Sequence, residues 1–186
     1  MRRLGLVYLV LIVVLGLSSC QPQPLSLAPP PQGLGATLNS NRSEYHPRLS
    51  YNGRYLVFAS DRDAQRRILL YDVQRRQLIP LPGLNQPGIL HDQPDISSDG
   101  RYIVYVSEQQ GKPDIFVYDR QNFQAQAITR NVLATVRHPT ISGNGRFIAF
   151  EVNRNGQWDV DIYDRGAGVE LSTPDALIPT APSSED

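Results

Sequence analysis

Two histidines and one glutamine stand beside proline at equivalent places in the chain, as His46, Gln93 and His138. Imidazole and amide side chains that converge on one opening could bind a polar ligand, and paired histidines could transfer protons. A polar residue that recurs at a regular interval can also belong to the scaffold. We interpret the three residues as candidates for ligand binding, with the scaffold role as the alternative, and we assign no catalytic residue.

Other groups of titratable residues do not assemble a recognisable catalytic or metal site. His91 and Asp92 could orient one another for proton transfer, but no nucleophile accompanies them, so a turn explains them. Two pairs of aspartates have a spacing that suits calcium: Asp61 with Asp63, and Asp159 with Asp161. Neither pair belongs to a complete calcium-binding loop. We therefore predict no metal, no cofactor and no enzymatic activity.

Five residues are candidates for binding because their charge or ring breaks the pattern of the rest of the chain: Arg66, Arg67, Arg75, Arg76 and Trp158. The two arginine pairs bracket one predicted strand and could hold carboxylates or phosphates through paired hydrogen bonds. The alternative is a solvated rim. The single tryptophan is predicted in a turn, where its ring could anchor a partner or stack on a sugar. Packing against a neighbouring structural unit is the alternative.

A sequence pattern that occurs three times determines where these residues lie. It starts at His46, Gln93 and His138, and each copy contains a turn dipeptide of the type that closes a tight hairpin: Asn52-Gly53, Asp99-Gly100 and Asn144-Gly145. A Tyr-Asp pair returns at the same interval, at residues 71, 118 and 163. An interval of about 45 residues is typical of propeller blades with four strands each.

Each repeat is predicted to form four antiparallel strands. First strands end at Ser50, Ser97 and Ser142; second strands span 55–59, 102–106 and 147–152; third strands span 68–71, 115–118 and 160–163; fourth strands span 77–81, 125–129 and 169–172. The second strands are apolar on both faces, except at Glu151, which predicts that neighbouring sheets cover each sheet on both sides. No segment shows sustained helical periodicity, so the fold class is all-β.

These repeats resemble the TolB-type β-propeller repeat. The matching residues are Pro47, Ser50, Gly53, Arg54 and Phe58 in the first repeat, Pro94, Ser97, Asp99-Gly100 and 114–116 in the second, and Pro139, Ser142, Gly145 and Asp159 in the third. The sequence departs from the motif at its tryptophan (Leu49, Ile96, Ile141), at the proline of its turn (Tyr51, Ser98, Gly143) and at Arg67. The resemblance implies three four-stranded blades at about residues 37–84, 85–131 and 132–174. It implies no activity, because this repeat serves docking platforms, peptidase gates and sugar-processing enzymes alike.

Three blades are fewer than the four to eight with which propellers close. Such a partial propeller leaves two blade faces bare, and exposed apolar faces favour a partner. We therefore expect either an envelope protein partner or a twofold dimer, in which blade three of each chain meets blade one of the other to complete six blades.

The first twenty residues have the pattern of an export signal. Arg2 and Arg3 precede an uncharged apolar run over residues 4–17, which is shorter than a membrane span. The run ends in Leu-Ser-Ser before Cys20, which resembles the lipobox of bacterial lipoproteins and implies cleavage of residues 1–19 and lipidation of Cys20. The alternative is an ordinary signal peptide or uncleaved anchor with an incidental cysteine.

Residues 20–36 are predicted to form a proline-rich tether, and residues 175–186 a flexible tail. By resemblance to lipoprotein sorting in enterobacteria, Gln21 after the lipidated cysteine implies the outer membrane.

The balance of charge disfavours a nucleic-acid-binding protein. The chain has 18 basic and 18 acidic side chains, so no summed positive field attracts phosphates. We therefore expect a non-catalytic lipoprotein on the periplasmic side of the cell envelope that acts as a platform for protein interactions. The alternatives are a glycan- or peptidoglycan-binding module and, less favoured, a hydrolase or lyase whose site forms at the assembled channel.

Overall fold

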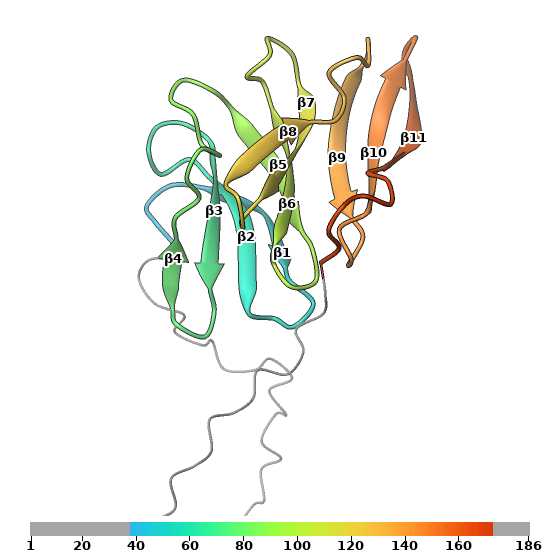
Figure 1. Ribbon diagram of the computed structural model, residues 1–186. Coiled ribbons are helices and arrows are strands. Elements are labelled where there is room, and N and C mark those ends of the chain that lie inside the picture. The colour runs from blue at the N-terminus through green and yellow to red at the C-terminus, as the bar shows by residue number, and fades with distance from the viewer. Residues whose placement is uncertain (1–37, 173–186) are drawn as a thin grey trace, which may run out of the picture. The chain divides into compact units, whose positions relative to one another are not determined.

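The computed structural model describes residues 38–172, and within this range the regular secondary structure consists of β-strands (Figure 1). The all-β prediction is therefore confirmed. The predicted signal peptide, Cys20, the tether and the C-terminal tail lie outside the described residues. In the part of the chain that is described, no helix is long and apolar enough to cross a membrane.

The strands form three antiparallel sheets, here called blades 1, 2 and 3. Blade 1 contains β1 (Glu44–Leu49), β2 (Tyr55–Ser60), β3 (Arg67–Asp72) and β4 (Gln77–Ile79), in that spatial order. Blade 2 contains β5 (His91–Ile96), β6 (Tyr102–Ser107), β7 (Asp114–Asp119) and β8 (Gln124–Ala127). Blade 3 contains β9 (Thr135–Ile141), β10 (Phe147–Arg154) and β11 (Gln157–Asp164).

The predicted fourth strand of blade 3, at residues 169–172, is wrong. This segment is not a strand, and its polar groups bond to β6 of blade 2 and to the first turn of blade 3. The Tyr102 hydroxyl donates to the Glu170 carbonyl, and the Ser172 amide donates to the Asn144 carbonyl. The segment therefore closes over the ends of two blades and leaves blade 3 with three strands in the described range.

A serine and an Asx residue shape the first hairpin of every blade. In blade 1, the Tyr55 amide donates to Ser50 Oγ, and Ser50 Oγ donates to Asn52 Oδ1. The Arg54 amide donates to the same Asn52 oxygen. Ser97 with Asp99, and Ser142 with Asn144, repeat this arrangement. The serines therefore belong to the turns, and each first strand ends one residue earlier than predicted.

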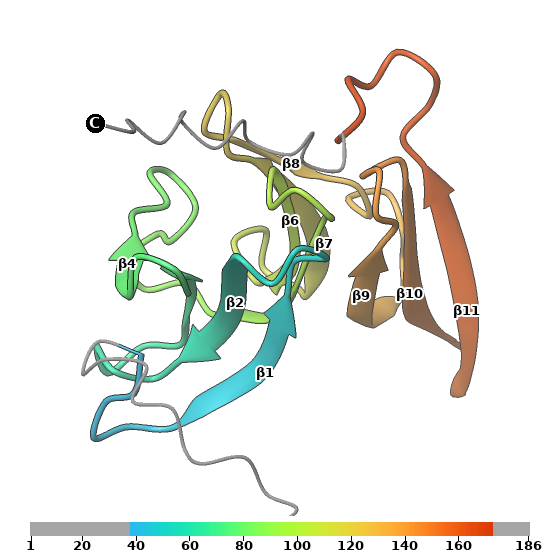
Figure 2. The same ribbon diagram turned by 90° about the horizontal axis from the view of Figure 1, so that it is seen from below.

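Blade 2 lies between the other two blades and is covered on both faces (Figure 2). All of β6 is buried. Ile103 and Tyr105 pack in the core with blade 1, whereas Tyr102 and Val104 pack in the core with blade 3. The prediction of burial on both sides is confirmed for blade 2.

Blade 3 differs, because β10 alternates between buried and less buried positions. Ile148, Phe150 and Val152 pack against blade 2, whereas Phe147 on the other face is exposed. The prediction that the second strand is covered on both sides is therefore wrong for blade 3, since no other part of residues 38–172 covers the side of blade 3 that points away from blade 2.

Aromatic rings and glycines join the blades at the ends of the second strands. A Cβ atom built on Gly100 would lie 2.3 Å from Cδ2 of Tyr55, and one on Gly145 would lie 2.5 Å from Cδ2 of Tyr102. Each ring of one blade therefore rests on the turn glycine of the next blade. An arginine of the next blade lies over each ring: Arg120 over Tyr55 and Arg165 over Tyr102.

Candidate functional site

The first strand of each blade carries a β-bulge at the residue that the sequence singled out. The pairing register shifts around His46, Gln93 and His138, and their φ angles are 50°, 52° and 49°. Left-handed backbone at a residue other than glycine costs free energy and persists only where the surroundings hold it. The three bulges lie on neighbouring strands, because β1 contacts β5 and β5 contacts β9. They line one small pocket of about 120 Å³ together with Arg48 and Thr140.

Two of the three bulge residues connect one blade to the next. His46 Nδ1 lies 3.0 Å from Asp92 Oδ1 in blade 2, and the His138 amide donates to Gln93 Oε1 over 2.6 Å. His138 instead turns back within its own blade, with Nδ1 3.1 Å from Glu151 Oε1. The contacts of His46 and Gln93 favour the scaffold interpretation for those two residues.

Asp92 is the centre of a charged network between blades 1 and 2. It accepts from Arg66 Nη1 over 2.8 Å, and Arg66 also donates to both oxygens of Asp61. These ion pairs raise the pKa of Arg66 further above its ordinary value, and Arg66 lowers the pKa of Asp61. The Arg66 guanidinium also lies 4.2 Å from the centre of the Tyr45 ring. Arg66 is therefore a structural cation whose carboxylate ligands belong to the chain itself.

The two arginine pairs bracket strand β3, as the sequence predicts. Arg67 begins β3 and pairs with Asp63 over 3.1 Å, whereas Arg75 and Arg76 lie in the turn that follows β3. The two arginine pairs thus stand at opposite ends of the strand. This spacing gives two separate charged rims and no single anion site.

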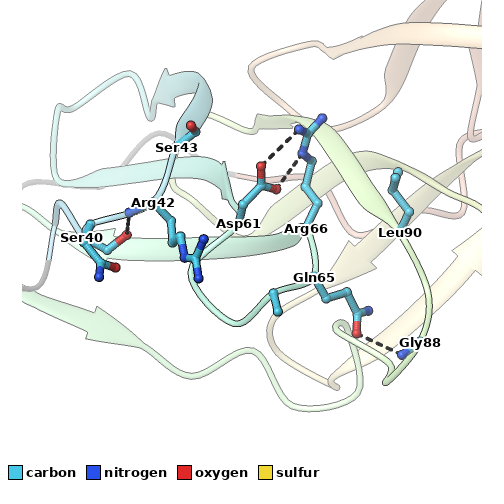
Figure 3. A pocket seen from close by; sticks show the side chains of 10 residues that line it. Ser40, Arg42, Ser43, Asp61, Gln65, Arg66, Gly88 and Leu90 are labelled. Carbon is cyan, nitrogen blue, oxygen red and sulfur yellow. Dashed lines mark hydrogen bonds and ion pairs between the residues drawn. The ribbon is translucent and has the colours of Figure 1, made fainter.

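An open polar hollow of about 1260 Å³ lies beside the Asp61–Arg66 ion pair (Figure 3). In its wall the Gly88 amide donates to Gln65 Oε1 over 2.9 Å, and the Arg42 amide donates to Ser40 Oγ over 3.1 Å. Sequence reasoning missed Arg42, because it precedes the first strand and has no counterpart in the other repeats. The hollow offers hydrogen-bonding groups from three loops but no nucleophile paired with a base.

His91 and Asp92 do not form the proton-transfer pair that the sequence suggested, because neighbouring residues of a strand point to opposite sides. The fully buried His91 ring has its edge toward Tyr105, and its Nε2 accepts from the Gln86 amide over 3.2 Å. Burial lowers the pKa of His91 to about 4. His91 is therefore a neutral core residue near pH 7.

The side of blade 3 that points away from blade 2 is an exposed apolar surface. It is called the far face and carries the exposed apolar residues Phe147, Trp158, Val160 and Ile162, with Ala149, Glu151 and Asn153 on the same side. The side chains of Val160 and Ile162 are 70% and 71% exposed, and that of Phe147 is 41% exposed. Their counterparts in blade 2, which are Ile115, Val117 and Tyr102, are buried against blade 3. The far face thus has the residue types of a blade contact without a covering blade in residues 38–172.

Trp158 lies in strand β11 and not in a turn as predicted, because the hairpin turn is formed by Asn155 and Gly156, both with positive φ. Its ring is partly exposed, and the Arg137 guanidinium lies 3.7 Å from the ring centre. Arg137 Nε donates to Glu151 Oε2 over 2.6 Å. Arg137 and His138 lower the pKa of Glu151. The ring therefore lies beside a charged cluster at one end of the far face.

The described residues contain no group of three or more histidines, cysteines or acidic residues that could hold a metal ion.

Comparison with known proteins identifies the fold. No protein-family model and no curated protein matches the sequence. Among solved structures, the chain is similar to TolB from Acinetobacter baumannii, with 23% identity, a TM-score of 0.54 and coverage of 70% of this chain and 32% of that chain. It is also similar to a protein from Agrobacterium tumefaciens assigned as TolB, with 21% identity, a TM-score of 0.56 and coverage of 69% and 47%. The chain thus spans between a third and a half of the length of these proteins.

A chain of a nidogen/laminin complex has the same arrangement of strands at 8% identity, with a TM-score of 0.51 and coverage of 66% of this chain and 44% of that chain. At these identities the likenesses show the fold alone. The three sheets are blades of a TolB-like β-propeller that does not close within the described residues.

Proposed function

We propose that this chain is a lipid-anchored interaction module that presents its propeller blades on the periplasmic side of a bacterial outer membrane. The far face of blade 3 carries this proposal, because Val160 and Ile162 are exposed where Ile115 and Val117 are buried between two blades. An apolar sheet face of this kind is typical of a protein contact surface. The lipobox-like sequence that ends at Cys20 supports an anchored location, and the TolB-like fold is consistent with an envelope protein.

The proposal includes no catalytic step. His46 and His138 hydrogen-bond to the carboxylates of Asp92 and Glu151 and not to a hydroxyl nucleophile. A carboxylate partner orients an imidazole, but acyl or glycosyl transfer also needs a nucleophile or a second carboxyl group facing the same substrate. The side chains that approach one another here connect strands and blades.

The anchor is tested by replacing Cys20 with serine in the native host. We expect the wild-type chain to incorporate labelled palmitate and to sediment with outer membranes, and the Cys20→Ser chain to lose both properties. Gln21→Asp is the matched control for sorting: it is expected to keep the label and to move to the inner membrane. Equal membrane association and labelling of the wild-type and Cys20→Ser chains would contradict the anchor.

The contact surface is tested with a photo-crosslinking residue placed at Val160 or Leu133. Both side chains are apolar and exposed, but Leu133 lies in the loop before β9 and outside the far face. We expect protein adducts from position 160 and none from position 133. Absence of adducts from position 160 in intact cells would contradict an interaction role for the far face.

A glycan-binding role is the second candidate, favoured by the position of Trp158 beside Arg137 and Glu151. An aromatic ring next to charged hydrogen-bonding groups can stack on a sugar and bind its hydroxyls. This role predicts retention of the wild-type chain on purified peptidoglycan and loss of retention in Trp158→Ala. Retention that Trp158→Ala leaves unchanged would exclude this site.

A further inference from the structure

We propose that the far face of blade 3 binds blade 1 of a second copy of this chain, so that two chains complete a ring of six blades about a twofold axis. This inference rests on the proposed function, because it names the partner of the same surface. It follows from two contacts that occur both between blades 1 and 2 and between blades 2 and 3. In each case, one partner of the contact remains unused on blade 3 and the other remains unused on blade 1.

The first repeated contact is the aromatic ring on the turn glycine. Tyr55 of blade 1 packs on Gly100 of blade 2, and Tyr102 of blade 2 packs on Gly145 of blade 3. The remaining ring is that of the exposed Phe147 on blade 3. The remaining glycine is Gly53 on blade 1, where an added Cβ would meet nothing within 4 Å. A second copy would place Phe147 of one chain on Gly53 of the other.

The second repeated contact is a backbone hydrogen bond between neighbouring turns. The Tyr51 amide of blade 1 donates to the Ser98 carbonyl of blade 2 over 3.2 Å, and the Ser98 amide donates to the Gly143 carbonyl of blade 3 over 2.9 Å. Within residues 38–172 the series ends at the Gly143 N–H and at the Tyr51 carbonyl. The proposed ring joins these two groups in the same donor-to-acceptor direction.

Exposed apolar residues at the end of β1 and on the far face fit the same contact, whereas the middle of that side of blade 1 is already covered, since Phe58 and Tyr71 are 3% and 0% exposed. Leu49 at the end of β1 is 59% exposed, whereas its counterparts Ile96 and Ile141 are buried. On blade 3, Val160 and Ile162 are exposed, whereas their blade 2 counterparts Ile115 and Val117 are buried. Leu49 and the far face would therefore gain in a dimer the burial that equivalent residues already have within the chain.

At the proposed contact two residues differ from the repeat, one on blade 3 and one on blade 1, and both changes are from a polar to an apolar side chain. Tyr102 donates its hydroxyl to the Glu170 carbonyl, and the cationic side chain of Arg165 covers its ring. Phe147 has no hydroxyl, and Val73 occupies on blade 1 the position of Arg120 and Arg165. The third contact therefore pairs an apolar ring with an apolar neighbour, where the other two contacts pair a tyrosine with an arginine.

The pairing of unlike faces closes a ring of two copies when the rotation between them is half a turn; a rotation that does not close gives an open chain. Six blades lie within the range of four to eight with which propellers close. A closed ring uses both contacts of each chain, so it predicts dimers and no larger species.

The test uses two thiol positions that the ring would bring together. Asp95 Oδ2 accepts from Thr140 Oγ1 over 2.7 Å, and these residues occupy equivalent positions in blades 2 and 3. Arg48 is the equivalent residue of blade 1 and is exposed. Thr140 of one chain is therefore expected to lie beside Arg48 of the other.

Full-length chains carrying Cys20→Ser are prepared in detergent with either Arg48→Cys or Thr140→Cys and with different tags. We expect a short bis-maleimide to join the two variants into a dimer that carries both tags, and to join neither variant to itself. Adding Val160→Asp and Ile162→Asp to the Thr140→Cys chain is expected to abolish the product. These positions are already exposed, so a folded monomer should remain, as circular dichroism checks. Leu133→Asp is the matched control and should leave the product unchanged.

Three results would overturn the proposal: no mixed product, a product that the far-face substitutions do not reduce, or a ladder of larger species from a chain with both thiols. The ladder would refute closure by a twofold axis. Protein adducts from position 160 without a mixed thiol product would refute the second copy and leave the proposed interaction role standing. Absence of both would refute both.

Discussion

Replacing Gly100 by alanine tests whether the ring-on-glycine contact holds blades 1 and 2 together. Gly100 and Gly53 both have positive φ, at 79° and 68°, so a side chain at either position costs about 1–2 kcal/mol of backbone free energy. Only at Gly100 would the new Cβ also lie 2.3 Å from the Tyr55 ring. Overpacking of this kind costs about 1–3 kcal/mol more. We therefore expect Gly100→Ala to lower the free energy of unfolding by about 2–5 kcal/mol and Gly53→Ala by about 1–2 kcal/mol.

The measurement is urea-induced unfolding followed by far-ultraviolet circular dichroism, in a Val160→Asp, Ile162→Asp background that keeps the chain monomeric. A Tyr55→Ala partner completes a double-mutant cycle, because removal of the ring should reduce the cost of Gly100→Ala to that of Gly53→Ala. Equal costs for the two glycine substitutions in the presence of Tyr55 would refute the reasoning, since backbone conformation alone would then account for both.

Two further predictions concern polar groups at the blade contacts. Asp95→Ala removes the acceptor of the Thr140 hydroxyl and the Ile141 amide and should lower the free energy of unfolding by about 1–3 kcal/mol in urea titrations, whereas Asp95→Asn should recover part of it. The pKa of His91 is lowered to about 4 in the folded chain, so the unfolded chain binds more protons between about pH 4 and 6.5. The contribution of His91 to the free energy of unfolding is therefore fully present above this range and decreases as the pH falls through it. Between pH 7 and pH 5 the loss should be about 2 kcal/mol, and His91→Gln should remove most of this dependence; an unchanged dependence in His91→Gln would show that other groups cause it.

The repeat was the part of the fold that sequence reasoning predicted well, because each turn is determined by nearby residues. Ser50, Asn52 and Gly53 make their hydrogen bonds within the hairpin that they form, so the same letters in blades 2 and 3 predict the same turn. The second and third strands follow from their apolar runs and lie within two or three residues of the predicted bounds.

The errors arose where a contact distant in sequence decided the local structure. Residues 169–172 have an alternating pattern, but Glu170 and Ser172 bond to Tyr102 of β6 and to Asn144 in the β9–β10 turn, and the segment does not pair with β11. Trp158 lies in β11 and not in the predicted turn, because the Asn155-Gly156 dipeptide, a strong signal for a hairpin, stands immediately before the strand. In the first case no local signal existed, and in the second the signal was present in the sequence.

Equivalent residues of the repeat differ in exposure although their residue types are nearly the same. Leu49 and Ile96, or Val160 and Ile115, are nearly identical residue types at equivalent positions, yet one of each pair is exposed and the other buried. Residue type alone therefore does not locate the open faces. The number and order of the repeats predict them, since exposure depends on which blade comes next.

Two of the differences in residue type lie at the open ends. Glu151 stands on the far face at the position of the buried Val106, and Val73 stands on blade 1 at the position of Arg120. The middle blade contacts a neighbour on each side through the same residue types. The open sides of the two end blades can carry other residue types, provided that these fit each other. Phe147 lacks the hydroxyl of Tyr102, and Val73 lacks the charge of Arg120, so both members of the proposed third contact are apolar, which is the match that a ring closed by a second copy requires.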